Sequence, residues 1–85
     1  MHHLTNKNNK IMATQVVKVG TKIKHTLFGG TICEGVVNGI EKCKYGEKYG
    51  KAVKTMKMSD KSRCYVLDID NGHWCYGDQV VEIIK

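Results

Sequence analysis

The sequence predicts a small all-β domain, and three observations carry that prediction. Two runs in which apolar and polar residues alternate, 63–69 and 73–76, flank the pair Asn71-Gly72, the strongest short-range signal for a β-hairpin. Nine glycines and no proline supply the turns that many short strands need. A chain of 85 residues buries only about 60% of the surface that its unfolded form exposes. A small binding module therefore fits it better than an enzyme with a large internal cavity.

The hairpin organises the chain, because a two-residue type I′ turn at Asn71-Gly72 would fix the pairing of its strands. Ile69 would then face Trp74, and Leu67 would face Tyr76. One face becomes apolar and consists of Tyr65, Leu67, Ile69, Trp74 and Tyr76. The other face consists of Cys64, Asp68, Asp70, His73 and Cys75. We therefore expect the core to be built on Trp74.

Residues 1–14 are polar and show neither the helical nor the strand period, so we expect a disordered tail before a single domain over residues 15–85. The tail contains His2 and His3, and a mobile histidine pair without a third ligand is not a designed metal site. The N-terminus also lacks the apolar segment of a secretory signal, and no run of about eighteen apolar residues occurs. We expect a cytoplasmic protein without a membrane partner.

The expected redox state of the cysteines follows from the cytoplasmic location, because thiols stay reduced in the cytoplasm. Their spacing misses the paired pattern of structural zinc sites, and an irregular ligand set is the alternative. We expect free thiols at Cys33, Cys43, Cys64 and Cys75.

A short lead-in and a first strand are predicted from residue 16 onward. Between Val17 and His25, lysines alternate with other residues, and Gly20 interrupts the alternation. Gly29-Gly30 then turns the chain. We expect Phe28 to anchor this turn in the core.

The next strand is predicted over Thr31–Glu41. Gly35 interrupts its alternation and indicates a bulge or sharp bend, which would let a small sheet curl into a barrel. Asn38-Gly39 could instead form a hairpin turn and shorten the strand, but we prefer a continuous strand. Its inward side chains are expected to be Ile32, Val36 and Ile40.

Residues 42–61 contain a near-repeat, KYGE followed by KYGK, over residues 44–51. We favour an elongated hairpin with the two Tyr-Gly units at its tip and a strand over Ala52–Met58, although a helical turn there would also fit. Residues 59–62 then turn the chain. Gly77-Asp78-Gln79 is expected to form one 3₁₀ turn before a final strand over Val80–Ile84.

Two segments resemble a known family. Residues 19–32, VGTKIKHTLFGGTI, are similar to the V-G-x-x-V-x-H-x-x-F-G-x-G-x-V opening of the Tudor-like tails of bacterial repair helicases, and Val66–Asn71 is similar to their closing strand and turn. The resemblance covers roughly two-thirds of the chain and implies an SH3-like barrel of about five strands, of the Tudor or KOW type. The sequence departs from the family in its long basic insertion at 42–61 and in the position of Gly30. Such domains bind RNA polymerase, nucleic acid or peptide tails, so the fold alone names no activity.

Positive charge is concentrated in one segment of the chain. The net charge is +6, from 14 Lys and Arg against 8 Asp and Glu. Residues 42–63 alone carry seven Lys and Arg63 but only two acidic residues. Residues 64–85 carry one basic residue, Lys85, and four acidic residues. Local positive charge is typical of a surface that contacts phosphate or an acidic protein. A lysine-rich loop that only keeps the protein soluble is the alternative.

No catalytic residue is predicted. Cys75, His73 and Asp70 would offer a thiol, an imidazole and a carboxylate on one hairpin face, but a nucleophile needs a pocket and an oriented base. A cross-strand contact between Asp70 and His73 is the simpler expectation. We therefore predict neither an enzyme nor a cofactor nor a metal site.

Tyrosines interleave with lysines only in residues 42–57. Tyrosine rings can stack on bases while lysine amines contact phosphates. Because the chain has a single arginine, the residue best suited to bidentate base recognition, we expect weak sequence specificity. The predicted site consists of Lys42, Lys44, Tyr45, Lys48, Tyr49, Lys51, Lys54 and Lys57.

These residues predict a monomeric, non-catalytic module that binds nucleic acid or a nucleic-acid-associated complex. The alternative is a protein-interaction or regulatory module, of phage or mobile-element origin, that contacts an acidic protein surface with the same lysines or pairs an exposed strand edge with a partner. In a third interpretation, Tyr45 and Tyr49 fold back onto the domain and close its end.

Overall fold

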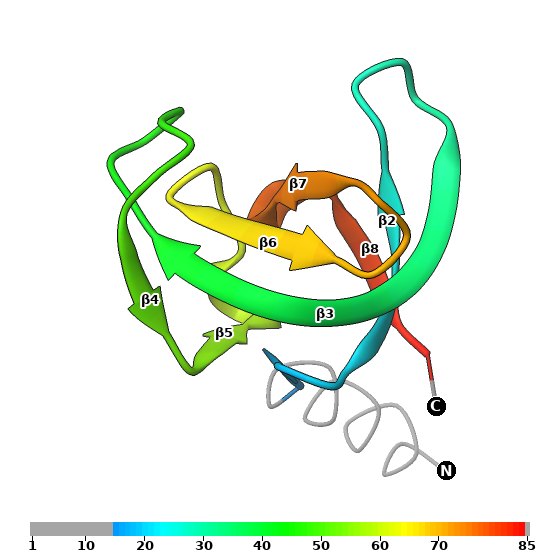
Figure 1. The fold of residues 1–85 in the computed structure, drawn as a ribbon, viewed down its shortest axis with the longest axis horizontal. Coiled ribbons are helices and arrows are strands. Elements are labelled where there is room, and N and C mark those ends of the chain that lie inside the picture. The colour runs from blue at the N-terminus through cyan, green and yellow to red at the C-terminus, as the bar shows by residue number, and fades with distance from the viewer. Residues whose placement is uncertain (1–14, 85) are drawn as a thin grey trace, which may run out of the picture.

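The computed structural model describes residues 15–84, which form eight strands and two 3₁₀ turns (Figure 1). The strands are β1 (Val16–Lys18), β2 (Lys22–Thr26), β3 (Ile32–Lys42), β4 (Lys51–Val53), β5 (Thr55–Lys57), β6 (Tyr65–Ile69), β7 (Trp74–Tyr76) and β8 (Val80–Ile83). The 3₁₀ turns are η1 (Met58–Asp60) and η2 (Gly77–Gln79). The prediction of an all-β domain is confirmed, and the predicted tail lies outside the described residues.

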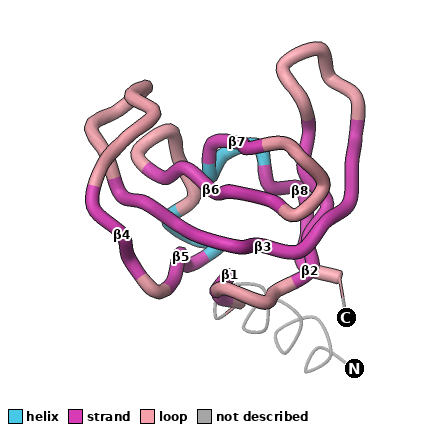
Figure 2. The backbone as a smooth tube through the Cα atoms, viewed as in Figure 1, coloured by secondary structure: helices cyan, strands magenta, loops and turns pink. Residues whose placement is uncertain are grey.

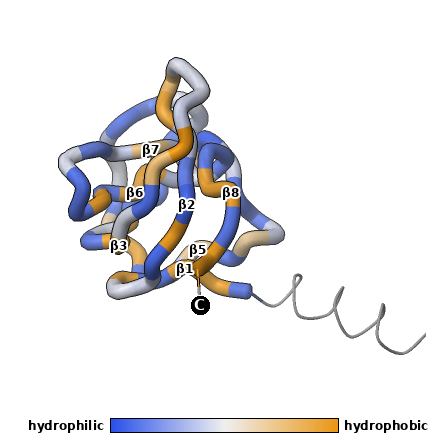
Figure 3. The backbone as a smooth tube through the Cα atoms, turned by 90° about the vertical axis from the view of Figure 1, so that its right-hand side faces the viewer, coloured by the Kyte–Doolittle hydropathy of each residue, from blue (hydrophilic) through white to orange (hydrophobic). Residues whose placement is uncertain are grey.

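Six strands form one sheet, in which β7, β6, β3, β2 and β8 are neighbours in that order and β4 also pairs with β3. The long strand β3 is strongly curved and passes through the middle of the sheet (Figure 1). Strands β1 and β5 pair with each other and lie below β3 in Figure 2. Along β2, the polar residues Lys22 and Lys24 flank the buried Ile23, whereas β8 begins with two valines of which only Val80 is buried (Figure 3).

The irregularity in β3 lies at Asn38 and not at Gly35. Val37 pairs with Ile69 and Gly39 pairs with Asp68, so Asn38 is an extra residue in the ladder with β6. Because of this bulge, Val37 and Ile40 are both buried although they are three residues apart. The strand is continuous, as predicted.

The predicted inward side chains of β3 are only partly correct. Ile40 is buried, but Val36 is half-buried and Ile32 is 58% exposed. That prediction assumed an uninterrupted period of two, which the bulge breaks. Gly35 instead allows the hairpin to approach β3 closely, because a Cβ atom there would overlap Ile69 Cγ2 and lie 3.0 Å from Asn71 Nδ2.

The central hairpin is present, but its register differs by one residue from the prediction. Leu67 pairs with Cys75, Asp68 pairs with Trp74, and the Ile69 N–H donates to the His73 carbonyl at 3.0 Å. The loop therefore has three residues, 70–72. Of these only Gly72 has a positive φ, 85°, as in a type I turn followed by a left-handed glycine. The predicted two-residue type I′ turn is wrong.

Asp70 and Asn71 hold this turn against β3 and β2. Asp70 Oδ1 accepts a hydrogen bond from the Val36 N–H at 2.8 Å, and the Asp70 N–H donates to the Val36 carbonyl at 2.9 Å. Asn71 Nδ2 donates to the Glu34 carbonyl and to Nε2 of the buried His25, both at 3.1 Å. A slip of one residue would break all of these contacts.

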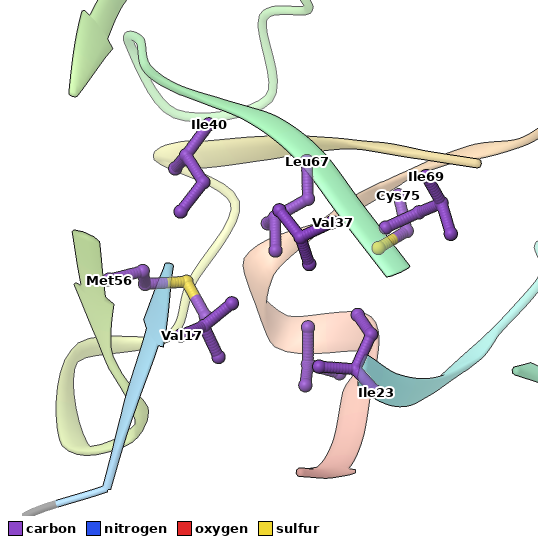
Figure 4. Packing of buried hydrophobic residues seen from close by; sticks show 9 residues of the cluster. Val17, Ile23, Val37, Ile40, Met56, Leu67, Ile69 and Cys75 are labelled. Carbon is purple, nitrogen blue, oxygen red and sulfur yellow. The ribbon is translucent and has the colours of Figure 1, made fainter. Parts of the chain in front are cut away.

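The register decides which hairpin side chains enter the core. Cys75 is fully buried, whereas Trp74 lies on the outer face and is only partly buried. Phe28 was also expected in the core but is 64% exposed. The buried cluster contains no Phe, Tyr or Trp and consists of Val17, Ile23, Val37, Ile40, Met56, Leu67, Ile69, Cys75 and Val80 (Figure 4).

The segment between β3 and β6 forms the predicted elongated hairpin, in which β4 pairs with the end of β3. The strand predicted over Ala52–Met58 is interrupted at Lys54, because β5 turns away to pair with β1 and buries Met56 opposite Val17. The 3₁₀ turn before the final strand is confirmed. Buried Gln79 in that turn donates through Nε2 to the Thr26 carbonyl at 3.0 Å.

Residues 15–84 include no helix with the length and apolar character needed to cross a membrane.

The register predicts which hairpin side chain matters most for stability. Leu67→Ala should lower the free energy of unfolding by about 2–5 kcal/mol, because the side chain is fully buried. Trp74→Ala should lower it by less, because Trp74 lies outside the core cluster. Urea unfolding of both variants measures the difference, and a larger loss for Trp74→Ala would contradict the observed register.

Candidate functional site

The predicted site residues centre on the loop between β3 and β4, residues 43–50, which we call the Lys/Tyr loop. The loop is fixed to the body of the domain at Gly46. The Gly46 N–H donates to the Arg63 carbonyl at 3.1 Å, and the Gly46 carbonyl accepts a hydrogen bond from the Tyr76 hydroxyl at 2.7 Å. The loop thus has a defined position beside the segment before β6 and the end of β7.

The two glycines of the near-repeat shape this loop in different ways. Gly46 has a φ of 79°, which other residues rarely adopt. Gly50 lies so close to β3 that a Cβ atom would overlap the Lys42 carbonyl. Its N–H donates to Glu41 Oε1 at 2.9 Å. The repeated Tyr-Gly pattern therefore reflects two separate backbone requirements.

Both tyrosines of the loop point into solvent. Tyr45 is 73% exposed and Tyr49 is 74% exposed. Their rings therefore do not close the end of the domain, and that interpretation of the sequence is wrong. Both rings are available to a partner.

The lysines of the predicted site fall into two groups. Lys44 and Lys48 lie in the loop, and Lys42 faces Lys51 directly across the pairing of β3 with β4. Lys54 and Lys57 follow the chain away from the loop toward β5, which lies below the loop in Figure 1. Within residues 15–84, none of the six lysines forms an ion pair, whereas Lys22, Lys24 and Arg63 each do.

Beside the loop lies a cluster of rings that the sequence did not predict as a site, Phe28, Trp74 and Tyr76, which we call the aromatic triad. The ring centroids are 5.5 Å apart for Phe28 and Trp74, 6.0 Å for Phe28 and Tyr76, and 5.3 Å for Trp74 and Tyr76. All three pairs meet edge to face. The triad joins the loop after β2 to the outer face of β7, and its rings differ in exposure: Phe28 is exposed, Trp74 is partly buried and Tyr76 is buried.

Lys48 connects the Lys/Tyr loop to the aromatic triad. Its Nζ lies 4.8 Å from the centroid of Trp74 and 5.6 Å from that of Tyr49. On the other side, Arg63 Cζ lies 4.7 Å from the centroid of Tyr76, and Arg63 Nε is 3.4 Å from Asp78 Oδ2. The loop and the triad thus form one continuous surface.

The triad was missed because the predicted hairpin register turned Trp74 and Tyr76 inward. One signal could have found it. Trp74 and Tyr76 are two residues apart and must share a face, and a three-residue loop 70–72 makes that face the one of Asp68. An acidic residue opposite a tryptophan is typical of an outer surface.

The thiol, imidazole and carboxylate of the hairpin do not come together as a reactive group. Asp70 binds the Val36 N–H, and His73 is exposed, with its ring centroid 6.5 Å from that of His25. Burial raises the pKa of Cys75 to about 12, and the Asp78 carboxylate adds to the shift, so the thiol stays protonated near neutral pH. The predicted pairing of Asp70 with His73 is wrong.

The other thiols offer no metal centre. Burial raises the pKa of Cys43, with smaller contributions from Cys64 and two nearby glutamates. The Cys43 thiol donates to the Glu47 carbonyl at 3.1 Å. All four cysteines are unbridged, and residues 15–84 contain no cluster of three His, Cys, Asp or Glu side chains that could hold a metal ion. His2 and His3 lie outside the described residues.

Comparisons of the chain with protein families, with curated proteins and with solved structures find no match.

The raised pKa of Cys75 predicts a loss of stability at alkaline pH. The folded state holds the thiol proton more tightly than the unfolded chain, whose cysteines titrate near pH 8.5. Its contribution is therefore complete below about pH 8.5 and is lost as the pH rises toward about 12. The measurement is urea unfolding at about pH 8 and about pH 10.5.

The Cys75→Ala variant should lose less stability between these two pH values than the parent protein. Cys33→Ala, which removes a partly exposed thiol, is the matched control and should behave as the parent. An equal pH dependence in Cys75→Ala and the parent would contradict the assignment.

Proposed function

We propose that this chain is a non-catalytic binding module that holds single-stranded nucleic acid, with weak sequence specificity, on the Lys/Tyr loop. One observation carries the proposal: Tyr45 and Tyr49 are about three-quarters exposed among lysines that form no ion pair within residues 15–84. Exposed rings offer stacking surfaces to bases, and unpaired ammonium groups offer contacts to phosphates.

The distribution of aromatic residues supports this function. A domain of this size usually uses its large rings to build the core. Here the core cluster is aliphatic and sulfur-containing, Tyr65 packs against it and Tyr76 is buried, whereas Phe28, Tyr45 and Tyr49 are each more than 60% exposed. Exposed aromatic rings lower the solubility of a protein, and a group of them is typical of an interaction surface.

The charge arrangement points to an anionic partner. Lys42 and Lys51 face each other across two paired strands, and like charges in that position destabilise a sheet. A bound phosphate would relieve the repulsion. The single arginine already pairs with Asp78, which leaves lysines, and lysines recognise phosphate charge better than base edges. Weak sequence specificity follows.

The fold that we propose for this module is an SH3-like barrel of the Tudor or KOW type. Three features support it: β8 pairs with β2 near the start of the domain, a 3₁₀ turn precedes β8, and β3 bends through the whole sheet. The ladder of β1 and β5 packs on the same core as the larger sheet. We further propose that the module is a cytoplasmic monomer.

The salt dependence of binding tests the role of the lysines. Affinity for a labelled oligothymidylate of about ten nucleotides, measured by fluorescence anisotropy, should fall steeply with salt. The triple variant Lys44→Ala, Lys48→Ala, Lys51→Ala should reduce the slope of log affinity against log salt by about 2.

A second triple variant separates site charge from net charge. Lys18→Ala, Lys22→Ala, Lys24→Ala removes the same charge from β1 and β2 and should leave the slope nearly unchanged, because these lysines lie outside the Lys/Tyr loop. Equal slopes for both triple variants would show that only net charge matters. Should the parent bind no anionic polymer at low salt, a protein partner replaces nucleic acid.

The tyrosines should contribute a term that salt does not remove. Tyr45→Ala and Tyr49→Ala should each weaken oligothymidylate binding at every salt concentration, by about 1–3 kcal/mol per lost stacked base. Their melting temperatures should stay near that of the parent, because both rings are exposed. Unchanged affinity in both folded variants would contradict a stacking role.

A further inference from the structure

Phe28 lies where a large ring is unexpected. It belongs to the turn between β2 and β3, which is closed by hydrogen bonds from the Leu27 N–H to the Thr31 carbonyl at 2.8 Å and from the Gly30 N–H to the Leu27 carbonyl at 2.9 Å. This tight turn holds Phe28 over β7, where its ring packs on Trp74 and stays 64% exposed. The contact fixes the ring without burying it.

The shape of the aromatic triad limits what can bind there. The rings are in mutual contact, with centroids no more than 6.0 Å apart, so no side chain can insert between them. The described residues also enclose no pocket. A ligand must therefore lie on the exposed ring of Phe28 and the accessible part of the Trp74 ring, and a planar group is suited to that contact.

The charges around the triad differ from one side to the other. Lys48 lies on the side of the Lys/Tyr loop, between Trp74 and Tyr49. The exposed carboxylate of Asp68 lies on the strand opposite Trp74, and Asp78 offsets the charge of Arg63. A phosphate is therefore attracted from the Lys48 side and repelled from the Asp68 side.

We propose that the aromatic triad is a second stacking platform of the nucleic-acid site, taking one base on Phe28 and Trp74 while Tyr49 takes the next. Lys48, whose Nζ lies close to the rings of Trp74 and Tyr49, contacts the phosphate between the two bases. The inference rests on the proposed function and adds the direction in which the strand crosses the site, with its phosphate on the Lys48 side of the triad. Because a duplex keeps its bases stacked on each other, the two platforms select a single strand.

The test uses Trp74, the only tryptophan of the chain, as an internal reporter. Titration of the full chain with oligothymidylate should quench Trp74 fluorescence in parallel with the rise in anisotropy of a labelled strand. Phe28→Ala should reduce affinity by about five- to 150-fold, the equivalent of one stacked base. A duplex of the same length should leave the fluorescence of Trp74 unchanged.

Matched variants separate stacking from apolar area and from folding. Phe28→Tyr keeps a ring and should keep the affinity, whereas Phe28→Leu keeps apolar area without a ring and should lose it. Ile32→Ala removes another exposed apolar side chain next to the same turn and should bind as the parent does. Circular dichroism melting of each variant confirms that it is folded.

The outcomes distinguish this inference from the proposed function. If the strand binds with Phe28→Ala as tightly as with the parent, and Trp74 fluorescence does not change, the second platform is wrong while the proposed function stands. If no strand binds at low salt, both fail. If polyglutamate quenches Trp74 and oligothymidylate does not, the surface serves an acidic protein and both proposals are overturned.

Discussion

The three-residue turn at 70–72 fixes how the central hairpin pairs and how it sits on β3. Asp70 grips the backbone of Val36, and Asn71 reaches both β3 and the buried His25, so the turn cannot slip along the sheet. Because side chains alternate along a strand, this one register sends Cys75 into the core and Trp74 out of it. Gly35 is part of the same constraint, since any larger residue would collide with the hairpin.

That register separates two kinds of apolar surface. The buried cluster consists of aliphatic and sulfur-containing side chains, while Phe28 and Trp74 lie on the outer face of the hairpin, in contact with the buried ring of Tyr76. The Lys/Tyr loop contacts these rings in two places: the Tyr76 hydroxyl donates a hydrogen bond to the loop, and Lys48 lies over the ring of Trp74. One strand register thus produces both an inner cluster of aliphatic and sulfur-containing side chains and an outer face that combines rings with lysines. The proposed nucleic-acid site is a consequence of how the hairpin is paired.

Sequence reasoning could predict the features that depend on local patterns. The all-β class, the continuous β3, the hairpin with its Tyr-Gly tip and the 3₁₀ turn at 77–79 each have a local signal in turn residues or alternation. Sequence reasoning failed for features that depend on contacts between residues far apart in the chain. The turn length depends on partners of Asn71 that lie 37 and 46 residues away, at Glu34 and His25. The Lys/Tyr loop was identified by composition, but its contact with the triad depends on the register and could not be found.

Amide chemical shifts during titration with oligothymidylate at low salt would locate the binding surface residue by residue, because every amide reports separately. The shifts should concentrate in the turn 27–31, in the Lys/Tyr loop 43–50 and in β7, including the indole N–H of Trp74. Strands β1 and β5, on the lower side of the domain in Figure 1, should stay unchanged. Shifts confined to β1 and β5, or no shifts at all, would contradict the proposed site.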